Sequence, residues 1–429
     1  MATTRKNSSE KLDHNTLRVR MYRVGFGDCF LISLPRTGTA AGGESHHHIL
    51  VDCGVHAKGN LNMIDDAVDH IGTTTNKKLS VVIATHSHQD HISGFSDKFT
   101  SFEIGEVWLP WCEDPKDKQA AKLLKKHAAL AEHLSDHFAA QFRASGRVTK
   151  SRAAATAAVA NLVQNKTALQ LLRSGFGVNA EVRYLEAGKS LNAPAGIKGL
   201  AVNILGPPRG QEFLSKMDPP EGQRYLRLKG NLTEEIDSLQ PFPKKWQMDA
   251  TAPELVGVRL SDVERKLFKN ELADASLDGL AFALDKAKNN TSLVVLLAFR
   301  GQHLLLPGDA QYGNWKAWLD KDDADSILAS VSFLKVAHHG SHNATPKGAL
   351  ERMTTGKFAA MVSTQNVPWD SIPRLPLMER LQEQTKNRVV RSDSLALEGV
   401  PKAPKGPAMA KLPAGFHKGD FWYDYLIKL

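Results

Sequence analysis

The chain has 429 residues, 42% of them hydrophobic and 24% charged, which is typical of a globular protein with room for one large domain or two ordinary ones. No stretch of about 18 apolar residues occurs, and the opening MATTRKNSSEKLDHNT lacks the apolar run of a signal peptide, which argues against membrane insertion and secretion. The formal net charge of +9 attracts phosphate-bearing partners, although many basic proteins bind no nucleic acid.

The cysteines point to a reducing compartment. Cys29, Cys53 and Cys112 are odd in number and lack metal-ligand spacing, so they predict neither a disulfide framework nor a cysteine zinc site. Together with the missing signal peptide, this predicts a cytoplasmic protein.

A first strand-rich region occupies residues 1–110. LRVRMYRV (17–24) alternates with the period of a half-buried strand. Further apolar runs bounded by Gly, Pro or polar residues predict four more strands: CFLISL (29–34), HHILVDCG (47–54), LSVVIATH (79–86) and IGEVWLP (104–110). Residues 61–71 carry apolar side chains at helical spacing.

The middle of the chain is built differently. Residues 116–143 are rich in Ala, Lys, Leu and Gln with an apolar stripe, and helix is expected again over 151–173, so 111–180 predicts a mainly helical insertion. Strand patterns return in 181–209, at EVRYLEAG and LAVNILGPP. Residues 210–288 form a second predicted insertion, with a helix opened by the capping box Ser261-Asp-Val-Glu264.

A second strand-rich region begins at 289 and is assigned, through 429, to the other half of the core and a C-terminal segment. TSLVVLLAFRGQHLLLPGD predicts two strands joined at Arg300-Gly301, and VSFLKVAHH (331–339) and KFAAMVST (357–364) predict two more. A helix is expected near 313–319. Strands interrupted by helices, twice over, predict two sheets with helices on their outer faces.

The strongest chemical signal follows the strand that ends near residue 85. His86, His88, Asp90 and His91 place four metal-competent side chains within six residues, and imidazole and carboxylate suit zinc and similar divalent ions. We expect His86 and His88 to reach one ion, and Asp90 and His91 to reach a second at the spacing of roughly 3.5–4 Å of two-metal hydrolases.

These motifs resemble a known superfamily. THSHQDHISGF resembles the His-x-His-x-Asp-His signature of the metallo-β-lactamase superfamily. The segments VGFGDCFLISL, ILVDCG, NNTSLVVLLAFRGQHLLLPGDA and FLKVAHHGSHNATP are similar to the soluble hydrolase domain of competence-type DNA-uptake proteins. The likeness spans residues 17–110 and 289–395. It implies an α/β fold, the αββα metallo-β-lactamase sandwich, interrupted here by two insertions of which the first is mainly helical.

The resemblance also implies roles for later residues. Asp309 would bridge both ions; the alternative is a turn aspartate after Pro-Gly. His339 would complete the ion bound by Asp90 and His91, with His338 as the alternative ligand. Asp52 would hold a metal-bound histidine in orientation, or would end its strand in a turn. The candidate catalytic residues are Asp90, His338, His342 and Asp52.

The sequence departs from the family pattern at several positions. No third histidine for the ion of His86 and His88 is evident; His133 and His137 share a helix face, for which a solvated surface is the simpler interpretation. Where competence-type proteins carry His-Pro, this chain has Ile372-Pro373. VGFGD indicates a tight hairpin and not a phosphate cradle.

The predicted function is metal-assisted hydrolysis by a phosphodiesterase or nuclease acting on nucleic acid, with two divalent ions, zinc or alternatively manganese. One alternative is a hydrolase of a small ester, lactone or cyclic nucleotide, with the insertions as lids. Another is a metal-binding subunit of a larger assembly, such as a bacterial phage-defence complex, that docks a protein partner through the helical insertion.

Overall fold

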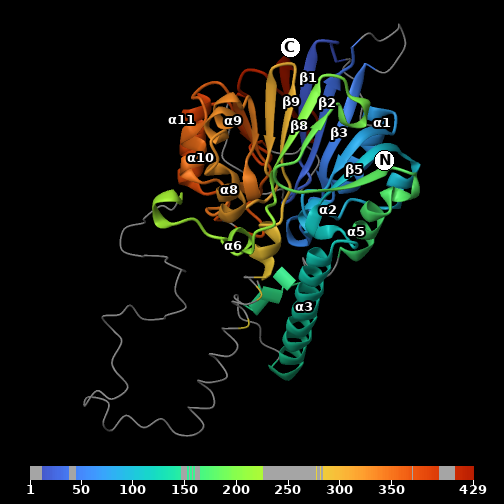
Figure 1. Ribbon diagram of the computed structural model, residues 1–429, viewed down its shortest axis with the longest axis vertical. Helices are drawn as coiled ribbons and strands as arrows, with labels where there is room; N and C mark the ends of the chain where they lie inside the picture. The colour runs from blue at the N-terminus through green and yellow to red at the C-terminus, as the bar shows by residue number, and fades with distance from the viewer. Residues whose placement is uncertain are drawn as a thin grey trace, which may run out of the picture.

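Two mixed β-sheets with helices on both outer sides form an α/β sandwich (Figure 1). The computed structural model describes residues 12–37, 45–145, 165–225, 284–369, 371–395 and 411–429, together with isolated positions at 152–159, 277 and 281. Most of the predicted second insertion, including the capping box at Ser261, lies outside the described residues. None of the helices described combines the length and apolarity needed to cross a membrane.

The first sheet has eight strands in the order β14-β15-β1-β2-β3-β4-β5-β6. The strands are β1 (Thr16–Tyr22), β2 (Cys29–Pro35), β3 (His46–Cys53), β4 (Lys78–Ile83), β5 (Glu103–Pro110), β6 (Glu181–Leu185), β14 (Phe416–Lys418) and β15 (Trp422–Lys428). Pairing is antiparallel from β14 to β3 and parallel from β3 to β6. The carboxyl ends of β3, β4 and β5 therefore meet at one edge of the molecule.

The second sheet has seven strands in the order β13-β12-β11-β10-β9-β8-β7. They are β7 (Ser190–Asn192), β8 (Leu200–Gly206), β9 (Val294–Phe299), β10 (Gln302–Leu306), β11 (Phe333–Lys335), β12 (Ala359–Val362) and β13 (Val389–Arg391). The predicted hairpin at Arg300-Gly301 is confirmed, because both residues adopt positive φ, 46° and 78°, between antiparallel β9 and β10. Strands β10 to β13 run parallel.

The main core lies between the two sheets. One apolar cluster joins alternate residues of β1, such as Leu17 and Val19, to Leu297 and Leu304 on the second sheet. Each fully buried aliphatic side chain there stabilises the fold by about 1.5–3 kcal/mol relative to exposure. The predicted alternation of LRVRMYRV is present, but its polar face is also buried, because Arg20 is only 4% exposed and pairs with Asp424 of β15.

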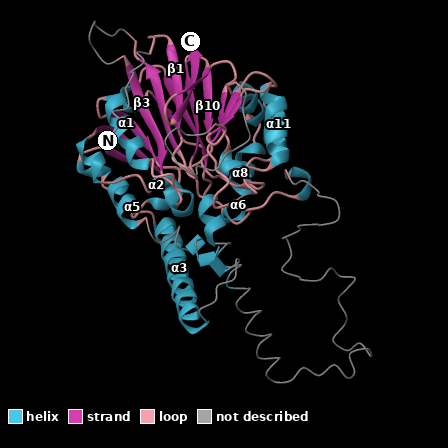
Figure 2. Cartoon of the chain, turned by 180° about the vertical axis from the view of Figure 1, so that it is seen from behind, coloured by secondary structure: helices cyan, strands magenta, loops and turns pink. Residues whose placement is uncertain are grey.

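Helices cover the outer face of each sheet (Figure 2). The helices near the first sheet are α1 (Ile64–Thr75), α2 (Gln89–Ile92) and α5 (Lys166–Arg173); those on the second are α8 (Tyr312–Leu319), α9 (Ala324–Ser330), α10 (Lys347–Arg352) and α11 (Leu375–Thr385). Short turns of helix occur at α6 (Gln211–Leu214), η1 (Ala57–Gly59), η2 (Asp97–Ser101), η3 (Trp111–Glu113), η4 (Gly175–Gly177), η5 (Pro194–Gly196), η6 (Glu221–Gln223) and η9 (Ala337–Gly340). The expected helices at 61–71 and 313–319 correspond to α1 and α8.

Helix α3 (Lys118–Ser145) extends away from the sandwich (Figure 1). Its length matches the helix expected over 116–143, and Leu134 and Phe138 from the predicted stripe are buried against Ala155 and Val159. The insertion that begins near residue 111 is therefore helical in its described part.

The chain order does not divide cleanly between the sheets. Within 181–209, β6 completes the first sheet and β7 and β8 enter the second. Although 289–429 was assigned to the second half of the core, β14 and β15 return to the first sheet, where β15 pairs with β1. The first sheet thus joins segments from the beginning and the end of the described chain.

Candidate metal centre

The candidate residues gather where parallel strands of both sheets end. His86 to His91 follow β4, Asp309 follows β10, and His339 follows β11. Because the carboxyl ends of parallel strands meet at one edge of a sheet, loops far apart in sequence converge there. The two sheets bring these edges together at the same end of the sandwich.

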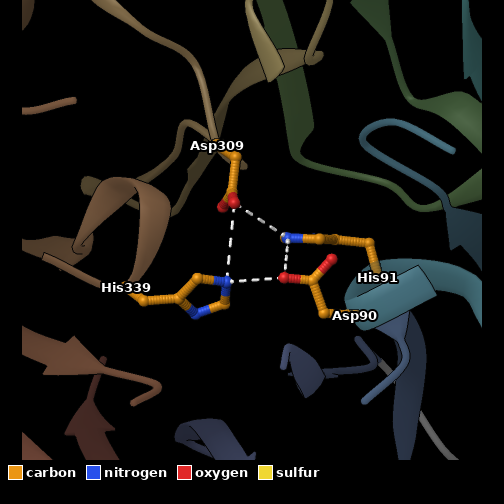
Figure 3. Close-up of side chains that lie close together, drawn as sticks. All are labelled: Asp90, His91, Asp309 and His339. Atoms are coloured by element: carbon orange, nitrogen blue, oxygen red, sulfur yellow. Dashed lines mark hydrogen bonds and ion pairs between the residues drawn. The ribbon is translucent and has the colours of Figure 1, made fainter. Parts of the chain in front are cut away.

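Four side chains form a tight cluster at this end (Figure 3). The ligand atoms of Asp90, His91, Asp309 and His339 all lie within 4.8 Å of one another. His91 Nε2 is 3.2 Å from Asp309 Oδ2, and His339 Nε2 is 3.1 Å from Asp90 Oδ2 and 3.5 Å from Asp309 Oδ2. All four residues are buried, so this donor set of two imidazoles and two carboxylates can hold a divalent metal ion.

Each of these histidines is anchored through its other ring nitrogen. His91 Nδ1 lies 2.8 Å from Asp52 Oδ2, and His339 Nδ1 lies 2.8 Å from the carbonyl oxygen of Ser363. An acceptor on one nitrogen fixes the tautomer, so that the opposite nitrogen presents a lone pair to the centre. One atom left without a hydrogen bond among the described residues is His91 Nε2, which a cation would satisfy.

The electrostatics show that the cluster is short of positive charge. Burial alone would lower the pKa of His91, but Asp309, Asp52 and Asp90 outweigh it and hold that pKa well above its usual range. Burial raises the pKa of Asp309, yet the charges of His91 and His339 more than reverse this and keep it well below normal. Without metal, protons on the histidines supply the charge that a cation would bring.

His86 and His88 lie beside this cluster and face each other. His86 Nε2 is 3.0 Å from His88 Nδ1, and the ring centroids of His86 and His91 are 4.1 Å apart. Burial lowers the pKa of His88 to about 4 and that of His86 well below its usual value, so both rings are neutral at pH 7. All six expected metal ligands thus lie in the same region, although His86 and His88 stand outside the four-residue cluster.

The remaining candidates occupy different positions. Of the two alternatives after β11, His339 belongs to the cluster, whereas His338 Nε2 is 3.9 Å from Asp309 Oδ2. His342 Nε2 lies 3.6 Å from Asp218. Pro373, at the expected His-Pro position, is packed so closely on the loop after β11 that a Cβ at Gly340 would come within 2.5 Å of it.

Asp52 connects His91 to the end of β4 through hydrogen bonds. Its Oδ1 accepts the backbone N–H of Thr85 and its Oδ2 accepts the Thr85 hydroxyl, both at 2.7 Å, in addition to contacting His91. Asp52, His338 and His339 all have φ between 45° and 54°, a left-handed conformation that non-glycine residues hold only when the surroundings enforce it. Such backbone strain is typical of functional sites.

Two buried charged residues were missed in the sequence. Asp28, interpreted as part of a tight hairpin, is 1% exposed, pairs with Lys335, and lies 3.6 Å from His91 Nδ1. Lys335, inside the apolar strand β11, also lies 3.3 Å from Asp309 Oδ1. The available signal was the charge itself, since a lysine or aspartate within an apolar run must find a partner when buried.

Glycine permits the loop carrying the motif to approach β3. A Cβ added at Gly54 would come within 2.5 Å of the His91 backbone, so any side chain there would push the motif away from Asp52.

A third missed residue, Glu113 in η3, ties the motif to other segments. Its carboxylate is 1% exposed and accepts hydrogen bonds from Ser87, Lys288 and Arg173. Ser87 stands between His86 and His88, so this carboxylate fixes the loop from the side of the helical insertion.

Comparison with known proteins adds no assignment. No family model matches the chain, and no curated protein matches it in sequence. The chemical interpretation of the centre therefore rests on its own geometry.

Proposed function

We propose that the chain is a metal-dependent hydrolase of the metallo-β-lactamase fold that cleaves phosphodiester bonds in nucleic acid. The observation that supports it is the buried cluster of Asp90, His91, Asp309 and His339, with its histidines anchored from outside. The two-sheet sandwich, with its motif-bearing loops at one end, is compatible with that fold.

Asp90, His91, Asp309 and His339 would hold one divalent ion, zinc or manganese, and His86 and His88 would contribute to a second. Ions bound there supply Lewis acidity, which lowers the pKa of water and offsets negative charge on the transferring group. Asp90 Oδ1 has no hydrogen-bond partner in the described chain. It can therefore accept a hydrogen bond from a water molecule and orient that water toward the substrate. Asp52 keeps His91 in place throughout.

His338 is the side chain best placed to contact substrate. Its side chain is 18% exposed, its Nδ1 lies 3.3 Å from Asn343 Oδ1, and burial lowers its pKa to about 4. With its one N–H on Nδ1 facing Asn343 Oδ1, the neutral ring presents the lone pair of Nε2, which can accept a hydrogen bond from a substrate hydroxyl or a water. A neutral His338 has no proton to give up, so protonation of the leaving group falls to His342, beside Asp218, or to a water.

The net charge of +9 supports a polyanionic substrate. One observation supports a second candidate, the hydrolase of a small ester, lactone or cyclic nucleotide. The six expected metal ligands are each at most 5% exposed, and a small substrate reaches a recessed centre more readily than a duplex does.

The test is a panel of DNA, RNA, cyclic-nucleotide and ester substrates, with Zn²⁺ and Mn²⁺ in parallel and metal content measured. For a nuclease we expect turnover and binding to fall steeply with salt, by about 0.9 in log affinity per log salt for each phosphate contact. Neutralising the exposed Lys122 and Lys125 of α3 should reduce that slope by about one each if they contact phosphates. His88→Ala should abolish turnover and spare most of the salt-sensitive binding.

Turnover of a small ester that ignores salt, with no nucleic-acid binding at low ionic strength, would replace the nuclease with the small-molecule hydrolase. Metal bound without turnover, together with tight association to a partner protein, would favour the assembly subunit.

A further inference from the structure

His86 and His88 stand outside the four-residue cluster, and no described Cys, Asp, Glu or further His forms a metal-binding group with this pair. Asn289, just before β9, brings its side chain to this place. Its Oδ1 is 2.8 Å from His88 Nδ1, which in turn is 3.0 Å from His86 Nε2. Neighbouring donor atoms around an octahedral ion with bonds of about 2.0–2.2 Å are separated by roughly 2.8–3.1 Å, so both distances are those expected within one coordination set.

Hydrogen bonding alone leaves one atom of this arrangement without a partner, because His88 Nε2 is buried and makes no hydrogen bond among the described residues. A neutral His88 carries one N–H. If the proton is on Nδ1, facing Asn289, then Nε2 directs a lone pair at Asp285 Oδ1, 3.4 Å away. If it is on Nε2, facing Asp285, then the lone pair of Nδ1 confronts the amide oxygen. A cation would take both the lone pair of Nδ1 and the amide oxygen, and the proton on Nε2 would then face the Asp285 carboxylate.

We propose that Asn289 Oδ1 is the third protein ligand of a second metal ion, held with His86 Nε2 and His88 Nδ1. The proposal rests on the metal-dependent function above and extends it to a residue type that the sequence motif does not contain. An amide oxygen is a harder ligand than imidazole and suits manganese or magnesium better than zinc. The second ion therefore binds more weakly than the first and prefers Mn²⁺ more strongly.

The surroundings of Asn289 hold it in place for this role. It is 1% exposed, and its backbone carbonyl accepts the hydroxyl of Ser292 at 2.7 Å. Its neighbour Lys288 donates to the same Glu113 oxygen, Oε1, that accepts the hydroxyl of Ser87. One buried carboxylate thus fixes the residue next to Asn289 and the residue between the two histidines, which sets the distance between the ligands.

The test measures bound metal per chain, with the full protein freed of metal and then dialysed against Mn²⁺ or Zn²⁺. We expect two Mn²⁺ in the native chain and one in Asn289→Ala. Asn289→Asp, which has the same shape, should keep two and tighten the weaker one at least tenfold. Asn289→His should retain two and shift the weaker ion from manganese toward zinc.

Asn343→Ala is the matched control, because Asn343 is a buried amide that also contacts a histidine ring, His338, at 3.3 Å but belongs to no proposed ligand set. It should keep two ions. A native chain that binds a single ion and still hydrolyses its substrate would overturn this proposal and leave the proposed function standing. A native chain that binds none would overturn both. Two ions retained with unchanged affinity in a folded Asn289→Ala would show that the amide is no ligand.

Discussion

His91 and His88 follow the same strand three residues apart, yet their surroundings are opposite. On the carboxylate side, formed by Asp90, His91, Asp309 and His339, the ring of His91 lies 2.8 Å from Asp52 and 3.2 Å from Asp309. The pKa of His91 is held well above its usual value. On the amide side, formed by His86, His88 and Asn289, burial lowers the pKa of His88 to about 4. The motif supplies the imidazoles, but distant loops decide how strongly each one attracts a cation.

The largest effect is expected from removing the Asp309 carboxylate, which faces His91 and His339. Asp309→Ala should weaken metal binding more than about 100-fold, beyond the range for residues that act only through a ligand, and abolish hydrolysis. Metal titration by calorimetry measures the affinity. Asp320→Ala, which removes an exposed partner of Lys316, should leave affinity unchanged. If Asp309→Ala bound metal as tightly as the native chain, the carboxylate side would not be the tighter metal site.

A smaller effect is expected from Asp52→Asn. The variant loses the charge that orients His91 and turns an amide N–H toward one of the two donors of Thr85, so metal affinity should fall by about 10–100-fold. The loss should be confined to the tighter ion, which calorimetry with Mn²⁺ resolves from the weaker one. Equal weakening of both ions would contradict a separate carboxylate side.

The most graded effect is that of pH. The pKa values of His91 and His339 are raised in the folded chain, by Asp309 in both cases against the opposing effect of burial. Their protonation therefore stabilises the metal-free fold fully below the unfolded pKa of about 6.5, and this stability is lost as pH rises through the raised values. Thermal unfolding of the metal-free chain should show that loss.

Metal affinity should instead rise with pH, because the metal must displace a proton from each protonated histidine. For each such proton the affinity rises by roughly tenfold per pH unit until that histidine is deprotonated. His86 and His88 are already neutral at pH 7, so binding on the amide side should be nearly independent of pH above 7. If the affinity for the tighter ion did not change with pH, the metal would not be displacing protons from His91 and His339, and the raised pKa values would be contradicted.

Long periodic elements were accessible from the sequence, because burial of one face imposes a period. The helix over 116–143 and the hairpin at Arg300-Gly301 are examples that the structure confirms. Strands of three residues, such as β7, β13 and β14, contain too few positions to show a period and were missed, and the seven-residue β15 of the C-terminal segment was missed as well.

The candidate site was only partly accessible in the same way. His86 to His91 are contiguous, and Asp309 and His339 stand at the ends of apolar strands. Asn289 was not recognised, because an amide is an uncommon ligand for zinc-type sites and its approach to His88 depends on a contact across 201 residues. Asp28 and Lys335 acquire meaning only as a pair, which sequence periodicity does not reveal.

The pairing of β15 with β1 has a consequence for the order of folding. Arg20 reaches its buried partner Asp424 across 404 residues, so β1 keeps an open edge and an uncompensated guanidinium until that segment has been made. Burying the Arg20 guanidinium without Asp424 would cost about 3–5 kcal/mol, and open strand edges promote aggregation. A growing chain that already carries His86 to His91 therefore leaves one edge of β1 unpaired until β15 docks.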